Sequence, residues 1–147
     1  MRAMLKQIWH RQDGSVIVEF ALIGPALLAM FLAVLHFGIG MQNYNALRSI
    51  SGDVARYAVV NYQTDTRLTT GQLSDFANGI ATRPPYGLQR SRFLATMQNA
   101  PVQRVVGATE YTLTLTYMVP TMLSIIGIDE IPITYTRPVF VVAPTAA

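Results

Sequence analysis

Cysteine is absent from the 147 residues, and histidine occurs only at His10 and His36. Without cysteine the chain forms no disulfide and no thiolate metal site. Two separate histidines do not supply the three or four ligands of a usual zinc site, and neither fits a serine–histidine–acid arrangement. No phosphate-binding glycine loop and no EF-hand loop occurs. The sequence therefore predicts a protein that is not an enzyme and that holds no metal or other cofactor.

Charged residues are also scarce, at 13% of the chain against 51% hydrophobic residues. The net charge is +3, and +2 of it lies in residues 1–14, which form a basic leader. Nucleic-acid binding needs several basic side chains on one face, because neutralising phosphates supplies most of the affinity. The only local basic group in the rest of the chain is Arg83, Arg90, Arg92 and Arg104. We expect it to be a solvated surface and therefore expect no nucleic-acid partner.

Residues 20–41 form a run of 22 residues without a charged side chain. About 20 apolar residues span a bilayer. The eleven Leu, Ile, Phe and Val residues of the run favour insertion by about 3 to 7 kcal/mol, which outweighs Pro25 and the glycines. The run is too long for a secretory signal peptide, and no Ala-x-Ala sequence follows it. These features predict a single-pass membrane protein, and the basic leader predicts a cytoplasmic N-terminus.

The remainder of the chain predicts an α+β fold. We expect the membrane helix of residues 15–41 to continue as a helix over residues 42–62, followed by a small exterior domain at residues 63–147. Apolar spacing predicts a short helix over residues 73–80, and residues 88–100 fit either a helix or irregular chain. Period-two alternation predicts strands at residues 111–119 and 131–135, with an edge strand at residues 102–106 and another strand at residues 139–142. Together they predict a small antiparallel sheet packed on the emerging helix.

A glutamate stands where the membrane run begins, five residues after Gly14. A charged carboxylate near hydrocarbon costs up to about 2.5–3.5 kcal/mol, so Glu19 indicates a function. If the chain is cut after Gly14, Ser15 gains an amine with a pKa of about 7.7–8.0, which is mostly cationic at neutral pH. Glu19 can then pair with this amine in its own helix or in an adjacent subunit. The alternative is that Glu19 is an ordinary acid at a membrane boundary.

Three stretches carry a resemblance to a known family. They are Gly14-Ser-Val-Ile-Val-Glu-Phe20-Ala-Leu-Ile-Gly-Pro25, then Phe37-Gly38, and Asp53-Val-Ala-Arg-Tyr-Ala58. Together they resemble the TadE-like pseudopilins, of TadE or TadF type, of the tight-adherence (Tad/Flp) pilus machinery.

The resemblance implies that residues 1–14 are a prepilin-type leader, which a prepilin peptidase removes between Gly14 and Ser15. Glu19 and Phe20 then act in assembly. It also implies a minor pilin of the inner membrane, with its C-terminal domain in the periplasm. The implied partners are other Tad pseudopilins, the Flp major pilin, the inner-membrane assembly platform and membrane lipid.

Two other hypotheses remain open. One is an unprocessed single-pass protein whose exterior domain binds a ligand or envelope component in a groove lined by Tyr111, Tyr117 and Tyr135, although core packing explains these tyrosines equally well. The other is a membrane enzyme that uses His36, against the simpler hypothesis of an amphipathic ring near the membrane interface.

Overall fold

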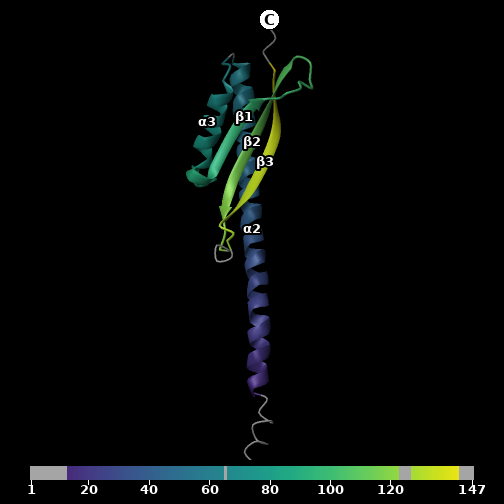
Figure 1. Ribbon diagram of the computed structural model, residues 1–147. Helices are drawn as coiled ribbons and strands as arrows, with labels where there is room; N and C mark the ends of the chain where they lie inside the picture. The colour runs from purple at the N-terminus through teal and green to yellow at the C-terminus, as the bar shows by residue number, and fades with distance from the viewer. Residues whose placement is uncertain (1–12, 65, 123–126, 143–147) are drawn as a thin grey trace, which may run out of the picture. The chain divides into compact units, whose positions relative to one another are not determined.

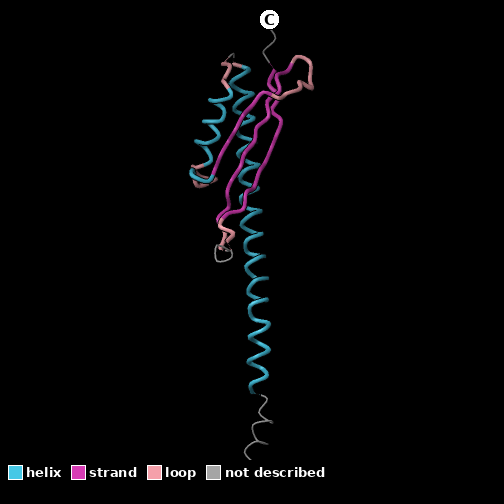
Figure 2. Tube along the Cα trace, in the orientation of Figure 1, coloured by secondary structure: helices cyan, strands magenta, loops and turns pink. Residues whose placement is uncertain are grey.

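The computed structural model describes residues 13–64, 66–122 and 127–142. The chain divides into two compact units, one that ends at Gly38 and one that begins at Ile39. The first consists, in its described part, of the first half of helix α2. The second holds the end of α2, a short helix and a three-stranded sheet, so the α+β fold predicted from the sequence is confirmed (Figures 1 and 2).

Helix α2 runs over Asp13–Gln63 without a break, as expected for residues 15–62. Beyond Ile39 it buries one face, on which Leu47, Ile50, Val54 and Ala58 recur every three or four residues. This spacing places the four side chains on one side of the helix. The helix extension therefore forms because its buried stripe is part of the hydrophobic core of the second unit.

Helix α3 runs over Thr70–Ala81 and begins with a capping box. The Thr69 hydroxyl accepts a hydrogen bond from the backbone N–H of Gln72 at 3.2 Å, and the Gln72 side chain accepts one from the N–H of Thr69 at 2.9 Å. These bonds satisfy two donors that a helix start otherwise leaves unpaired. The buried side of α3 faces α2, where the rings of Tyr57 and Phe76 stack with their centroids 3.8 Å apart.

The sheet is antiparallel, with the order β1-β2-β3. Strand β1 runs over Phe93–Asn99 after the short helix η1 at Arg90–Arg92, β2 over Ala108–Pro120 and β3 over Glu130–Val142. Leu115 of β2 lies opposite Ala95 of β1 and Tyr135 of β3. The alternate residues of β2 from Leu113 to Val119 are buried in one core with α2 and α3.

Two strand predictions were wrong. Residues 102–106 are not an edge strand but part of the loop between β1 and β2, which Gly107 closes at φ 83°. The strand beside β2 at this edge of the sheet is β1, which lies in the segment that fitted either a helix or irregular chain in the sequence. Residues 139–142 are not a separate strand either, because they continue β3 beyond Pro138. Residues 123–126, between β2 and β3, lie outside the described residues.

The two edges of the sheet are protected in different ways. On β1, the backbone N–H of Met97 donates to the hydroxyl of Ser74 at 2.9 Å, and that of Ala95 donates to the side-chain oxygen of Asn78 at 3.3 Å. Both acceptors belong to α3. Edge strand β3 carries Pro132 and Pro138, which have no N–H to offer to an incoming strand.

Candidate functional site

The residues expected at the cleavage and assembly site lie in the first turns of the described part of α2. Gly14 and Ser15 are helical, and the first twelve residues of the leader lie outside the described residues. Glu19 is exposed, and Phe20 is 74% exposed. The Phe20 ring lies beside Gly24, where an added Cβ would be 3.7 Å from the ring. Because the described helix begins at Asp13, Glu19 lies beyond its first turn, where the helix dipole stabilises a carboxylate less.

Ser15 and Glu19 are four residues apart in this helix, so Glu19 lies about one turn beyond the backbone nitrogen of Ser15. This backbone arrangement is compatible with the pairing expected between the Ser15 amine and Glu19 in a cleaved chain. Cleavage itself and the pairing stay predictions.

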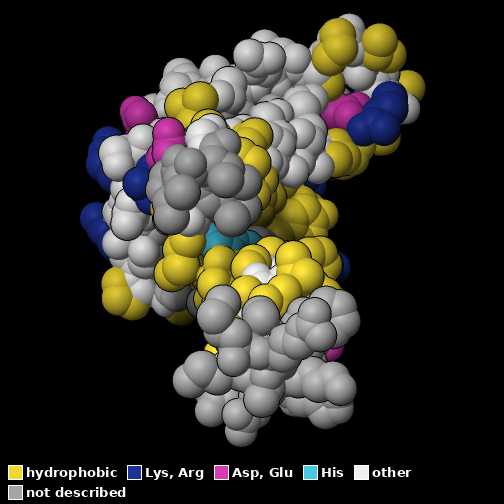
Figure 3. Space-filling model, turned by 60° about the horizontal axis from the view of Figure 1, so that its bottom comes forward, with side chains coloured by type: hydrophobic (Ala, Val, Ile, Leu, Met, Phe, Trp, Pro, Cys, Tyr) yellow, Lys and Arg dark blue, Asp and Glu magenta, His cyan; other side chains and the backbone are white. Residues whose placement is uncertain are grey.

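Helix α2 contains a candidate membrane span within Val16–Gln63. Its most apolar window has a mean hydropathy of 2.3 and no buried residue. Except for Leu32, which is partly buried, its large hydrophobic side chains from Val16 to Phe37 are exposed. Figure 3 shows such side chains gathered around the visible end of the described helix. An apolar surface of this kind needs lipid or other apolar helices around it, which supports a membrane anchor.

His36 lies on this apolar helix. Its Nδ1 donates a hydrogen bond to the carbonyl oxygen of Leu32, one turn earlier, at 2.7 Å. In the part of the chain that the structure describes, no group of three His, Asp or Glu side chains could hold a metal ion.

The three tyrosines proposed to line a ligand groove pack against the core instead. Tyr117 is 5% exposed, and Tyr111 and Tyr135 are partly buried against the same core. The ring of Tyr135 also meets that of Tyr44 edge to face, with the centroids 5.6 Å apart. The structure therefore favours the core-packing explanation for these residues over a tyrosine-lined binding groove.

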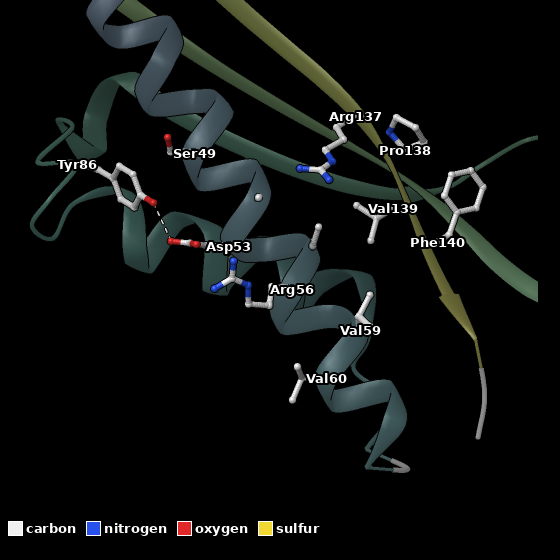
Figure 4. A pocket seen from close by; sticks show the side chains of 12 residues that line it. Ser49, Asp53, Arg56, Val59, Val60, Tyr86, Arg137, Pro138, Val139 and Phe140 are labelled. Carbon is white, nitrogen blue, oxygen red and sulfur yellow. Dashed lines mark hydrogen bonds between the residues drawn. The ribbon is translucent and has the colours of Figure 1, made fainter. Parts of the chain in front are cut away.

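An open groove of about 750 Å³ lies elsewhere, between α2 and the edge strand β3. We call it the α2–β3 groove. It is lined by Gly52, Ala55 and Val59 of α2 and by residues 137–140 of β3. Figure 4 shows Val59 on the helix and Arg137 to Phe140 on the strand. A ridge on α2 borders the groove, and the ridge residues, which follow the helical spacing of three and four, are Ser49, Asp53, Arg56 and Val60.

The ridge is fixed to the rest of the domain by Asp53. Its Oδ2 accepts a hydrogen bond of 2.7 Å from the hydroxyl of Tyr86, which lies in the turn between α3 and β1 (Figure 4). Burial, the hydrogen bond to Asp53 and the negative charge of that carboxylate raise the pKa of Tyr86 to about 12. The tyrosine thus stays protonated and keeps donating at any physiological pH.

The groove also contains an arginine at a position where the strand otherwise faces the core. Ile133, Tyr135, Val139 and Val141 point inward from β3, and Arg137 takes the place between them. Its Nη1 lies 3.8 Å from where a Cβ on Gly52 would stand. Among the described residues it has no ion pair, since the two that occur join Arg92 to Glu130 and Arg104 to Glu110.

Sequence reasoning missed this groove. The signal for it was the arginine that interrupts the apolar alternation of residues 133–141, together with a glycine inside a helix, where it costs about 1 kcal/mol relative to alanine. What the sequence could not supply is the contact between positions 52 and 137, which are far apart along the chain.

A second cluster of polar groups supports the loop between β1 and β2. Glu110 is 2% exposed, and both its carboxylate oxygens accept from Nε of Arg104, at 2.9 and 3.1 Å. The Gln103 side chain accepts from the N–H of Glu110 at 2.6 Å. The guanidinium of Arg104 also lies 5.6 Å from the ring centroid of Phe140 on β3. These contacts fix a loop, and they satisfy a buried acid rather than form a binding site.

Residues 14–56 match the model of the TadE-like protein family. The match begins at Gly14, covers the apolar part of α2 and ends at Arg56, so it includes Asp53 of the ridge but not Tyr86 or Arg137. No curated protein and no solved structure matches the chain.

Proposed function

We propose that this TadE-like chain is a minor pilin, or pseudopilin, that acts in the assembly of Flp-type Tad pili. The observation that carries the proposal is the match over residues 14–56, which begins at the expected cleavage point and continues through the candidate membrane helix. The TadE-like family is one of structural pilus components rather than enzymes. A non-catalytic role agrees with the scarcity of histidine and the absence of cysteine.

In this proposal a prepilin peptidase cuts after Gly14, and the new amine of Ser15 is neutralised by Glu19. The exposed apolar surface of α2 supports this step, because an unpaired ammonium or carboxylate beside lipid is costly. The amine can come from the same helix or from a neighbouring subunit. In the second case Glu19 sets the axial register at which helices pack.

The same proposal places the chain in the inner membrane, with the leader in the cytoplasm and the C-terminal domain in the periplasm. Its partners are then the prepilin peptidase, other Tad pseudopilins, the Flp major pilin, the assembly platform and membrane lipid. The charge of the leader supports this orientation, since basic residues near a membrane span remain on the cytoplasmic side.

Intact-mass and N-terminal analysis of chain extracted from membranes that contain the peptidase tests processing. We expect a mature chain that begins at Ser15, and we expect Gly14→Ala to abolish cleavage. Gly38→Ala is the matched control, because an added methyl group at position 38 has no atom within 4 Å in the structure. A mature chain that still begins at Met1 refutes processing.

The role of Glu19 is tested separately by counting pili. Glu19→Ala and Glu19→Gln should both be cleaved normally, and both should assemble few pili, since each removes the charge and Gln keeps the shape. Normal numbers of pili in either variant would remove the assembly role assigned to this carboxylate.

A further inference from the structure

Arg137 lies on the inward face of β3, between Tyr135 and Val139, which pack in the core. It is partly buried, faces α2 and has no carboxylate partner among the described residues. Removing a charge from water is unfavourable unless an opposite charge compensates it. The groove around Arg137 is open, so a carboxylate from another molecule can reach it.

The helix wall beside Arg137 also leaves room for another molecule. Gly52 destabilises the helix interior relative to alanine, yet a Cβ at this position would make only an ordinary contact, 3.8 Å from Nη1 of Arg137. Packing inside the chain therefore does not require glycine at position 52. A close approach by a second backbone or side chain does benefit from it.

A carboxylate of the right kind lies on the neighbouring ridge. Asp53 is exposed, and the hydroxyl of Tyr86 holds one of its oxygens, Oδ2. The other oxygen has no hydrogen bond within the part of the chain that the structure describes. Arg137 approaches α2 at Gly52. Asp53 is the next residue, about 1.5 Å further along the helix axis.

We propose that the α2–β3 groove binds the ridge of a second copy of this chain, with Asp53 of each copy paired to Arg137 of the other. In a dimer whose twofold axis runs parallel to this part of α2, the ridge of one copy faces the groove of the other, and residues keep their level along the axis. Asp53 of the second copy then meets Arg137 beside Gly52. The parallel arrangement rests on the proposed function, in which both copies are anchored in one membrane by the same helix.

Strand addition is the less favourable way to join two copies. Pro132 and Pro138 interrupt the donors of the β3 edge, and side chains of α3 occupy the donors of Ala95 and Met97 on β1. The groove, in contrast, is open and contains the cation Arg137. The ridge beside the groove carries the opposite charge, on Asp53. Charge self-complementarity is what a twofold interface requires.

The absence of cysteine makes crosslinking a clean test. The full chain carrying Ser49→Cys, in native membranes, is treated with a short bis-maleimide. Ser49 is an exposed ridge residue, and we expect a product of twice the chain mass. The control is Leu94→Cys, which is 61% exposed on the opposite face of the sheet and should yield no dimer. Equal crosslinking at both positions overturns the proposal.

Charge exchange then tests the pair itself. In the Ser49→Cys chain, Arg137→Asp should reduce the dimer product about tenfold, Asp53→Arg should do the same, and the two together should restore it. Arg90→Asp makes the same charge change at an exposed residue outside the groove and should leave the dimer unchanged. Circular dichroism confirms that each variant is folded.

Further outcomes also contradict the proposal. They are an undiminished dimer in Arg137→Asp, no recovery in the double exchange, and a crosslinked product whose mass shows a different protein in the groove. Failure here is distinguishable from failure of the proposed function, because N-terminal processing is measured on the same membranes. A processed chain that does not crosslink refutes only the dimer, and a dimer of unprocessed chains refutes only the processing.

Discussion

Replacing Tyr86 with phenylalanine removes one hydrogen bond and almost no volume, so this change isolates the contact that fixes the ridge. The bond from the Tyr86 hydroxyl to Asp53 is 2.7 Å long and has an ionised acceptor. Bonds to charged groups contribute about 1.5–3 kcal/mol when they are buried. This one lies in an open groove, where solvent screening reduces its contribution, and we expect Tyr86→Phe to lower the free energy of unfolding by about 1 kcal/mol.

Because the pKa of Tyr86 is raised in the folded chain, the stability that this residue contributes falls at high pH. The pKa rises from the ordinary 10.0 to about 12 in the folded chain. Below pH 10 the tyrosine is protonated in both the folded and the unfolded chain, and the stabilisation is complete. As the pH rises through the interval from 10 to 12, the unfolded chain loses this proton first, so the stabilisation disappears. The difference in stability between the wild-type chain and Tyr86→Phe should therefore shrink across that interval.

Thermal unfolding of the full chain in detergent, followed by near-ultraviolet circular dichroism, measures both effects. A loss of about 1 kcal/mol corresponds to a fall of roughly 4–8 °C in the midpoint for a domain of this size. Tyr44→Phe is the matched control, because the Tyr44 hydroxyl makes no hydrogen bond within the described residues while its ring contacts Tyr135. Equal midpoints for Tyr86→Phe and the wild-type chain would refute the reasoning. So would a difference that stays constant from about pH 8 to 12.

Two further changes test the core and the support of the β1–β2 loop. Leu113→Ala truncates a side chain that is 0% exposed and should lower the free energy of unfolding by about 2–5 kcal/mol. The control Thr112→Ala, on the outer face of the sheet, should lower it by less than about 1 kcal/mol. Equal losses in thermal unfolding would contradict the assigned core face. Hydrogen bonds from Arg104 lower the pKa of Glu110 below its ordinary 4.5. The wild-type chain should therefore lose stability as the pH falls below 4.5. Glu110→Gln should be less stable above that pH, and its stability should depend less on pH. Parallel profiles would remove this role from Glu110.

The elements that the sequence predicted well are those with a long, regular pattern. Helix α2 follows from an uncharged run of 22 residues and a continuing stripe of apolar positions, and β2 follows from strict alternation between Leu113 and Val119. Strand β1 was harder to predict, because Leu94 is apolar but exposed and blurs the alternation of its buried neighbours. The valines at 102, 105 and 106 suggested a strand by composition alone, yet they lie exposed in a loop that Glu110 and Arg104 hold in place.

The two candidate sites also differ in whether a local sequence pattern identifies them. Gly14, Ser15, Glu19 and Phe20 form one short local pattern, so the sequence alone identified them as candidates. The α2–β3 groove needs a helix, a turn and an edge strand to meet, and nothing in the local sequence fixes those distances. Arg137 is informative only once the inward face of β3 is known, because on the outward face an unpaired arginine would simply be solvated.

The protection of the sheet edges limits how this domain can join neighbours. An unprotected edge strand binds nearly any extended chain through backbone hydrogen bonds, with little dependence on side chains. Here α3 covers the donors of β1, and two prolines interrupt those of β3. Association of the folded domain must then proceed through side chains, whose charge and shape distinguish one neighbour from another. In the proposed assembly role, we expect such selectivity to reside in the Asp53 ridge and the Arg137 groove.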